Sequence, residues 1–129
     1  MSVHRESVFY EDAKGHSDVR ETLRSINKDD PRHTRHIRNK IRLLEQVEDI
    51  DTDATRSRLV KRPTAHIYVL IVSGHGGFAF RLPFFVPECK GGKQIVFTGC
   101  EKRRGLDGNY GSLIEIAEFR RSDWIHRNC

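Results

Sequence analysis

The feature that most constrains the fold is the stretch 66–103, which holds three apolar runs separated by two glycine-bearing breaks. The first run, 67–72, is continuously apolar, as in a strand covered on both faces. The second, 78–86, alternates so that Phe78, Phe80 and Phe84 share one face and Arg81 lies on the other. The third run, 95–100, leads directly into a basic cluster. We therefore expect a three-stranded antiparallel meander whose last strand ends in positive charge.

Two amphipathic helices are expected before the meander, after a short first strand at 7–10. Apolar residues recur at helical spacing behind Ser17, which favours a helix that begins there. Asp30 followed by Pro31 predicts a second helix start, because a capping carboxylate precedes proline in the first turn. This second helix is expected to run to about Glu48 and is the most basic segment of the chain.

The C-terminal part of the chain predicts one more helix. Ser112 and Glu115 have the spacing of a capping box. One side of the helix is expected to carry Leu113, Ile116, Ala117 and Arg120, with Trp124 at its end. The whole chain, 1–129, is thus predicted to be one α+β domain. It would consist of a small antiparallel sheet with an N-terminal two-helix layer and a C-terminal helix.

Composition narrows the class of protein. The net charge is +5, and a small basic domain often binds a polyanion such as nucleic acid. No apolar run has the roughly 18 residues that a membrane helix needs, so no membrane partner is expected. The first residues carry acids and no apolar signal core, and the three cysteines form no C-x-x-C pair. These features predict a reduced cytoplasmic protein without a structural metal or cofactor.

Three short motifs carry a resemblance to a known family. They are Phe80-Arg81-Leu82 with Phe84-Phe85, the strand IVFTGCEKR at 95–103, and the helix EIAEFRRSDW at 115–124. In this order they resemble the RelE/HigB superfamily of toxin–antitoxin ribonucleases, nearer its HigB and phage-related branch. The resemblance is best over 59–126, about half of the chain.

The resemblance implies a toxin that cleaves mRNA on the ribosome as a metal-independent endoribonuclease. It also implies a cognate antitoxin that covers the cleft or its C-terminal helix. In such a reaction the RNA 2′-OH attacks the phosphorus, and the enzyme supplies a base, an acid and cations for the phosphorane. Arginine suits the last task because its fork matches phosphate oxygens.

These requirements single out candidate site residues. Arg81 is expected to face the open side of the sheet without core packing and to act as the main cation, with Lys102 or Arg103 as the second. His126 is the candidate acid or base. The plainer alternatives are a solvated arginine, a strand-end charge cluster and an inert terminal histidine. The residues expected to bind RNA are Arg32, Arg35, Arg38, Lys61, Arg62, Arg104, Arg121 and Trp124.

Histidines elsewhere are interpreted as surface residues. His33 and His36 lie on the basic helix and His75 in the first glycine break. No cysteine or acid accompanies them, which is weak support for a metal site. The glycine break itself lacks the lysine and the helix of a phosphate loop, so it is expected to be a hairpin turn.

The chain departs from the family pattern in ways that keep two other functions open. The first meander strand lacks an arginine, Cys100 stands where a phenylalanine is usual, and Trp124 stands where a tyrosine is common. A tryptophan there can anchor the helix or stack on a base, but its ring N–H can only donate. One alternative is a non-catalytic, ParE-like inhibitor of gyrase. The other is a nucleic-acid-binding protein that uses the basic helix 31–48.

Overall fold

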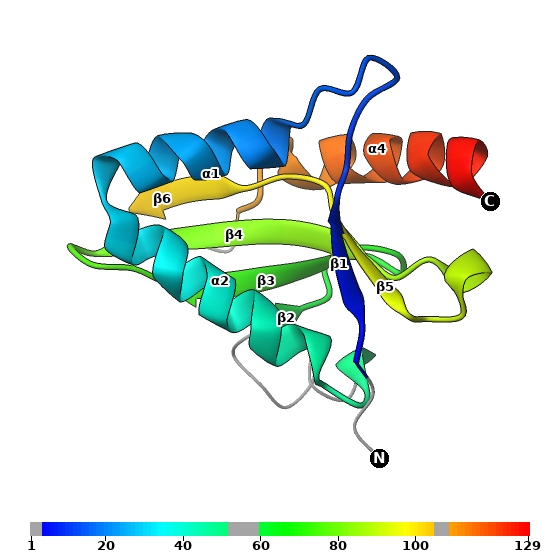
Figure 1. Cartoon of the computed structure of the whole chain (residues 1–129), viewed down its shortest axis with the longest axis horizontal. Helices are drawn as coiled ribbons and strands as arrows, with labels where there is room; N and C mark the ends of the chain where they lie inside the picture. The colour runs from blue at the N-terminus through cyan, green and yellow to red at the C-terminus, as the bar shows by residue number, and fades with distance from the viewer. Residues whose placement is uncertain (1–3, 52–59, 105–108) are drawn as a thin grey trace.

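A mixed sheet carries helices on both of its faces (Figure 1). The protein is seen as a computed structural model that describes residues 4–51, 60–104 and 109–129. The elements, in chain order, are β1 (Glu6–Phe9), α1 (Asp18–Asp29), α2 (Pro31–Glu45), β2 (Val60–Lys61), β3 (Tyr68–Ser73), β4 (Phe78–Phe85), the 3₁₀ turn η1 (Glu88–Lys90), β5 (Gln94–Phe97), β6 (Glu101–Arg104) and α4 (Leu113–Asn128). The predicted α+β class is confirmed.

The sheet has the order β1-β5-β4-β3-β2, and β6 pairs with the remaining part of β4. β3 and β4 form the expected antiparallel hairpin, and β4 turns back into β5. β1 lies parallel to β5, with Glu6 opposite Gln94. The sheet is therefore mixed, whereas the sequence predicts an antiparallel sheet. Parallel neighbours need a long crossover, and the chain between these two strands contains both N-terminal helices.

The third strand of the meander is broken, although the sequence predicts it to be continuous into the basic cluster. β5 pairs with the end of β4, and β6 pairs with its beginning. Between them the N–H of Thr98 donates to the carbonyl of Pro83 at 2.9 Å. Arg120 of α4 donates to the carbonyl of Thr98 at 2.6 Å. Proline has no N–H for a ladder bond, so the pairing is interrupted at this point.

Both predicted N-terminal helix starts are confirmed. The hydroxyl of Ser17 accepts a hydrogen bond from the N–H of Arg20 at 3.2 Å. The carboxylate of Asp30 accepts one from the N–H of Arg32 at 3.0 Å. The capping box at Ser112 is wrong, because this residue has helical φ and ψ and its side chain makes no capping bond. An N-cap needs an extended backbone for its side chain to reach the free N–H groups.

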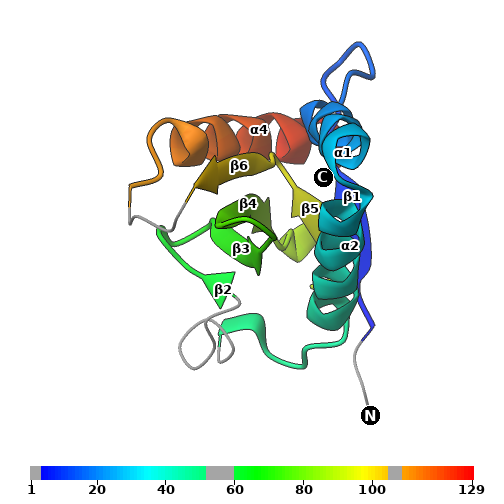
Figure 2. The same ribbon diagram turned by 90° about the vertical axis from the view of Figure 1, so that its left-hand side faces the viewer.

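Two cores lie on opposite sides of the strands. In Figure 2, α2 stands on one side of the strands and α4 runs above β6. We call the two sides the α1–α2 face and the α4 face. The buried residues of the larger core, on the α1–α2 face, are Val19, Ile26, Ile37, Leu44, Ile50, Val60, Tyr68, Leu70, Val72, Phe80, Leu82, Phe84, Ile95 and Phe97. Those of the smaller core, on the α4 face, are Tyr10, Ile67, Phe85, Val96, Ala117 and Trp124.

The C-terminal helix packs on the sheet through Ala117 and Trp124. Trp124 is 6 % exposed, and its ring lies edge-on to Phe85 with the centroids 5.5 Å apart. The structure therefore places Trp124 as an anchor and leaves no ring face for a base. Ile116, expected on the same side as Ala117, is 41 % exposed, whereas Ala117 is buried. A disulfide between Cys89 and Cys129 joins η1 to the end of this helix, so the expectation of reduced cysteines is wrong for two of the three.

Cys100 keeps a free thiol. Burial raises the pKa of this thiol to about 12, and the neighbouring charge of Glu101 adds to the effect. The thiol therefore stays protonated at neutral pH, which makes it a poor nucleophile. Within the described ranges, none of the helices combines the length and the apolar character needed to span a bilayer.

Candidate functional site

The register of β6 divides the basic cluster between the two faces of the sheet. Glu101 lies opposite Arg81, and Arg103 is two residues further along the same side. Side chains that oppose each other across a ladder share a face, and neighbours along a strand alternate. Arg81, Glu101 and Arg103 therefore belong to the α4 face. Lys102 and Arg104 belong to the α1–α2 face.

Arg81 is buried, contrary to the expectation of an open position. It is 2 % exposed, and its guanidinium lies 3.1 Å from the carboxylate of Glu101. It donates to the carbonyl of Asn109 at 3.0 Å and lies 4.7 Å from the ring centroid of Tyr110. The segment before α4 thus covers this part of the sheet. A buried cation is tolerated only with such partners, so Arg81 has a structural role that the sequence did not predict.

A surface depression lies beside these residues, with a volume of about 510 Å³. We call it the β6 depression; it is lined by Glu101, Lys102, Arg103, Asn109, Tyr110, Gly111, Ser112, Leu113 and Ile116. Arg103 donates to the same carbonyl of Asn109 as Arg81, at 2.7 Å. A carboxylate, a phenol and a guanidinium thus border one concave surface, with a second guanidinium next to it. Such groups can bind an anion and move protons.

Glu101 and Tyr110 are site residues that the sequence did not reveal. Glu101 joins the site because it pairs with Arg81 across the ladder. Tyr110 joins it because the chain returns over the α4 face before the last helix begins. Strand register and the path of the segment before α4 depend on contacts between distant parts of the chain. The sequence therefore showed only the alternation of β4, which gives the face on which Arg81 lies and not the residues that contact it.

Lys102 and Arg104 both lie against the ring of Phe78 on the α1–α2 face. The ammonium of Lys102 lies 4.2 Å from the centroid of Phe78, and the guanidinium of Arg104 lies 4.9 Å from it. Lys102 also borders the β6 depression. Its charge, however, is held toward the α1–α2 face, so Lys102 and Arg103 do not point into one cleft.

His126 does not join the predicted catalytic set. It is exposed near the end of α4, whereas Arg81 contacts the segment just before this helix begins. A rise of about 1.5 Å per residue over thirteen residues separates the two ends by roughly 20 Å. The structure therefore brings Arg81 and Arg103 together, but not His126.

The residues expected to bind RNA are spread over separate parts of the surface. Arg35 and Arg38 are exposed on α2, whereas Arg32 is paired with Asp30 at 2.9 Å. Arg62 is paired with Asp51 at 2.8 Å, near the exposed Lys61 of β2. Arg121 borders a different hollow, next to the disulfide. Together with the burial of Trp124, this spread leaves no single surface that holds the whole set.

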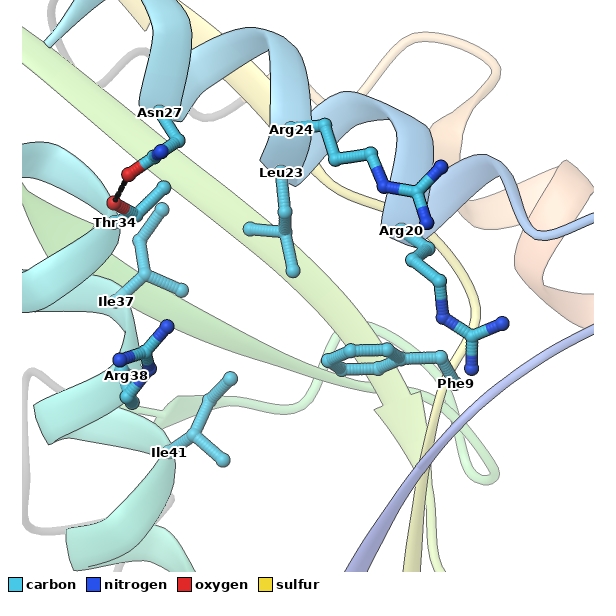
Figure 3. A pocket seen from close by; sticks show the side chains of 9 residues that line it. All are labelled: Phe9, Arg20, Leu23, Arg24, Asn27, Thr34, Ile37, Arg38 and Ile41. Carbon is cyan, nitrogen blue, oxygen red and sulfur yellow. Dashed lines mark hydrogen bonds between the residues drawn. The ribbon is translucent and has the colours of Figure 1, made fainter. Parts of the chain in front are cut away.

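A second hollow lies between α1, α2 and β1 (Figure 3). We call it the helix groove; its volume is about 440 Å³. Its floor is apolar, and its rim carries three arginines. The side chains of the floor are Phe9, Leu23, Ile37 and Ile41, and those of the rim are Arg20, Arg24 and Arg38. A hydrogen bond of 2.6 Å from Thr34 to Asn27 closes one end. An apolar floor with a cationic rim suits an amphipathic helix that carries acids.

Comparisons with protein-family models, with curated proteins and with solved structures found no match.

Proposed function

We propose that the protein is the toxin of a toxin–antitoxin pair and cleaves mRNA as a metal-independent endoribonuclease, on the ribosome by the RelE/HigB resemblance. The observation that carries the proposal is the β6 depression, where Arg103, Glu101 and Tyr110 border one concave surface above Arg81. The resemblance of the strand and helix motifs supports the same function. A net charge of +5 favours a polyanionic substrate.

In this proposal the carboxylate of Glu101 takes the proton of the RNA 2′-OH. Arg103 binds the phosphorane, which carries more negative charge than the ground state, so this cation lowers the barrier more than it aids binding. The phenol of Tyr110 donates a proton to the departing 5′-oxygen. Arg81 is a positioning residue, since its ion pair of 3.1 Å orients the carboxylate of Glu101.

The proposed partner, a cognate antitoxin, docks in the helix groove. The groove offers an apolar floor and an arginine rim, so the antitoxin segment is proposed to be an amphipathic helix with acids on its flanks. Arg24→Glu is expected to weaken antitoxin binding and leave RNA cleavage unchanged. Lys28→Glu makes the same charge change on α1 outside the groove lining and serves as its control.

The test of the enzymatic function is induced expression in bacteria, followed by growth measurement and mapping of transcript ends. Arg103→Ala and Glu101→Gln should each slow cleavage by about 10²–10³. Lys14→Ala removes an exposed cation in the loop before α1 and should cleave like the wild type. Wild-type cleavage rates in Arg103→Ala would show that the site is wrongly placed.

A second candidate is a non-catalytic binding module, such as a gyrase inhibitor or a nucleic-acid-binding protein. One observation favours it: the predicted catalytic set is not assembled, because Arg81 is buried among partners and His126 is at the far end of α4. Intact transcripts during growth arrest, together with loss of gyrase supercoiling in vitro, would decide for the inhibitor. Binding of nucleic acid with neither effect would decide for the simple binding module.

A further inference from the structure

Two histidines from distant parts of the chain meet on the α1–α2 side of the sheet. His36 lies on α2, and His75 lies in the turn between β3 and β4. Their Nε2 atoms are 3.1 Å apart, and both side chains are exposed. The ring centroids are 5.0 Å apart and the planes are inclined by 54°. This contact is a hydrogen bond, in which one Nε2 donates its N–H and the other accepts. When the donor ring instead carries its proton on Nδ1, both Nε2 lone pairs are available to one ion at a point that solvent also reaches.

The position of His75 is fixed by its backbone. Its N–H donates to Nε2 of His33 at 2.8 Å, and the ring of His33 stacks on that of His75 with the centroids 5.7 Å apart. His33 is expected at the surface, but it is 3 % exposed and packs edge-on against Phe80 at 4.9 Å. Gly74 allows this approach, because a Cβ there would lie 2.8 Å from the ring of Phe80 and 2.9 Å from that of His33. The turn is thus held against α2 before any ligand binds.

We propose that His36 and His75 bind one divalent transition-metal ion, such as Zn²⁺, Ni²⁺ or Cu²⁺, through their Nε2 atoms. Imidazole suits these metals better than Mg²⁺ or Ca²⁺, which prefer oxygen ligands. Metal–nitrogen bonds of about 2.0–2.1 Å place two ligand nitrogens roughly 2.9 Å apart at a right angle and roughly 3.3 Å apart at a tetrahedral angle. The observed 3.1 Å lies between these values. Water fills the remaining positions, since both imidazoles are exposed.

The same distance argues against a catalytic pair. An acid and a base that act on one phosphate must stand on either side of it, and nitrogens 3.1 Å apart leave no room for that group. The ion would also join α2 to the β3–β4 turn. Metal binding should therefore raise the stability of the fold as well as occupy the site.

A competing site provides the internal control. Among the described residues, the ligand atoms of His16, Asp18 and Glu21 lie within 4.8 Å of one another, and all three side chains are exposed. The Nδ1 atom of His16 already lies 3.3 Å from the carboxylate of Glu21 at the surface. An ion at that site would depend on His16, whereas the proposed site depends on His36 and His75.

The experiment is a titration of the full, untagged chain with Ni²⁺ and with Zn²⁺, followed by calorimetry and thermal melting. We expect one ion per chain and a rise in Tm of about 4–7 °C at ten times the Kd. His36→Gln and His75→Gln should each weaken binding at least about tenfold, which reduces the shift in Tm to about 1–2 °C or less at the same metal concentration. His16→Gln should bind like the wild type.

The two ring nitrogens give a readout independent of stability. On addition of Zn²⁺, the ¹⁵N signals of Nε2 in His36 and His75 should shift together, and those of His16 should not. The proposal is overturned by unchanged affinity in both His36→Gln and His75→Gln, by loss of binding in His16→Gln, or by the absence of binding to the wild type. Because both substituted side chains are exposed, circular dichroism without metal should show that the variants are folded.

Discussion

Both faces of the β4–β6 ladder carry cationic side chains, but the two faces differ in how far these side chains are buried. On the α4 face, Arg81 is buried in an ion pair with Glu101 and bonded to Asn109. On the α1–α2 face, Lys102 and Arg104 remain at least partly exposed around the ring of Phe78. The strands are the same, so the difference comes from what covers each face. Arg81 stabilises the fold because another segment of the chain covers it. Lys102 and Arg104 can still contact ligands because solvent reaches them.

The faces differ in their packing too. The α1–α2 face holds the larger core, whereas the α4 face holds a small core that includes Trp124. A small core depends more on each of its members, because fewer contacts remain when one is removed. The following predictions test this contrast, starting with the largest expected effect.

Removal of Trp124 should have the largest effect on stability. Trp124→Ala is expected to lower the free energy of unfolding by about 3–5 kcal/mol, since it deletes a buried ring that packs on Phe85. Phe119→Ala, on the same helix, is the control, because Phe119 is 73 % exposed and its loss should cost under about 0.5 kcal/mol. Denaturant unfolding of both variants measures this. Equal losses would contradict the division into a packed and an open side of α4.

Arg81→Ala should have the next largest effect, about 2–4 kcal/mol of unfolding free energy. The substitution leaves the carboxylate of Glu101 without its ion pair; that side chain is 32 % exposed, so the loss is smaller than for a fully buried pair. Lys102→Ala on the opposite face should cost under about 1 kcal/mol. Chemical denaturation compares the two directly.

A double variant sharpens the same comparison. If the ion pair is the reason for the loss, Glu101→Gln should make Arg81→Ala less harmful, and the two effects should not add. Additive losses would mean that Arg81 stabilises the fold through its contacts with Asn109 and Tyr110 instead.

High pH should destabilise the α1–α2 face through Tyr68. Burial raises the pKa of this phenol to about 12, and its hydrogen bond to Asp51 adds to the shift. The folded protein then keeps a proton that the unfolded chain releases above about pH 10, so stability is full below pH 10 and falls as pH approaches 12. The loss should be at most about 2–3 kcal/mol. Unfolding curves at pH 9 and pH 11.5 measure it, and Tyr68→Phe should remove this part of the pH dependence.

The smallest effect is expected at Cys100. Its pKa of about 12 leaves roughly a thousandth of the thiolate that a free cysteine would have, so the folded protein should not react with a thiol reagent at pH 8. The reagent should label this thiol promptly in denaturant. Fast labelling of the native protein would show that Cys100 is accessible.

Much of the local structure could be predicted from the sequence. Ser17, Asp30 and Pro31 mark the helix starts, because caps are made within one turn of chain. The alternation of 78–86 predicts strand β4 and places Arg81 on the face opposite to Phe80 and Phe84. These features depend on residues close together in the sequence. The spacing of apolar and polar residues shows directly which of them share a face of a helix or strand.

The tertiary structure alone decided what each side chain meets. Arg81 is buried because the segment that begins at Asn109 folds back over it. The disulfide brings together Cys89 and Cys129, which are forty residues apart in the sequence. The pairing of His36 with His75 depends on how closely a glycine turn approaches a helix. Register and covering layers are set by contacts between distant parts of the chain. Periodicity shows which way a side chain points along its own element, and packing decides whether another element or solvent lies there.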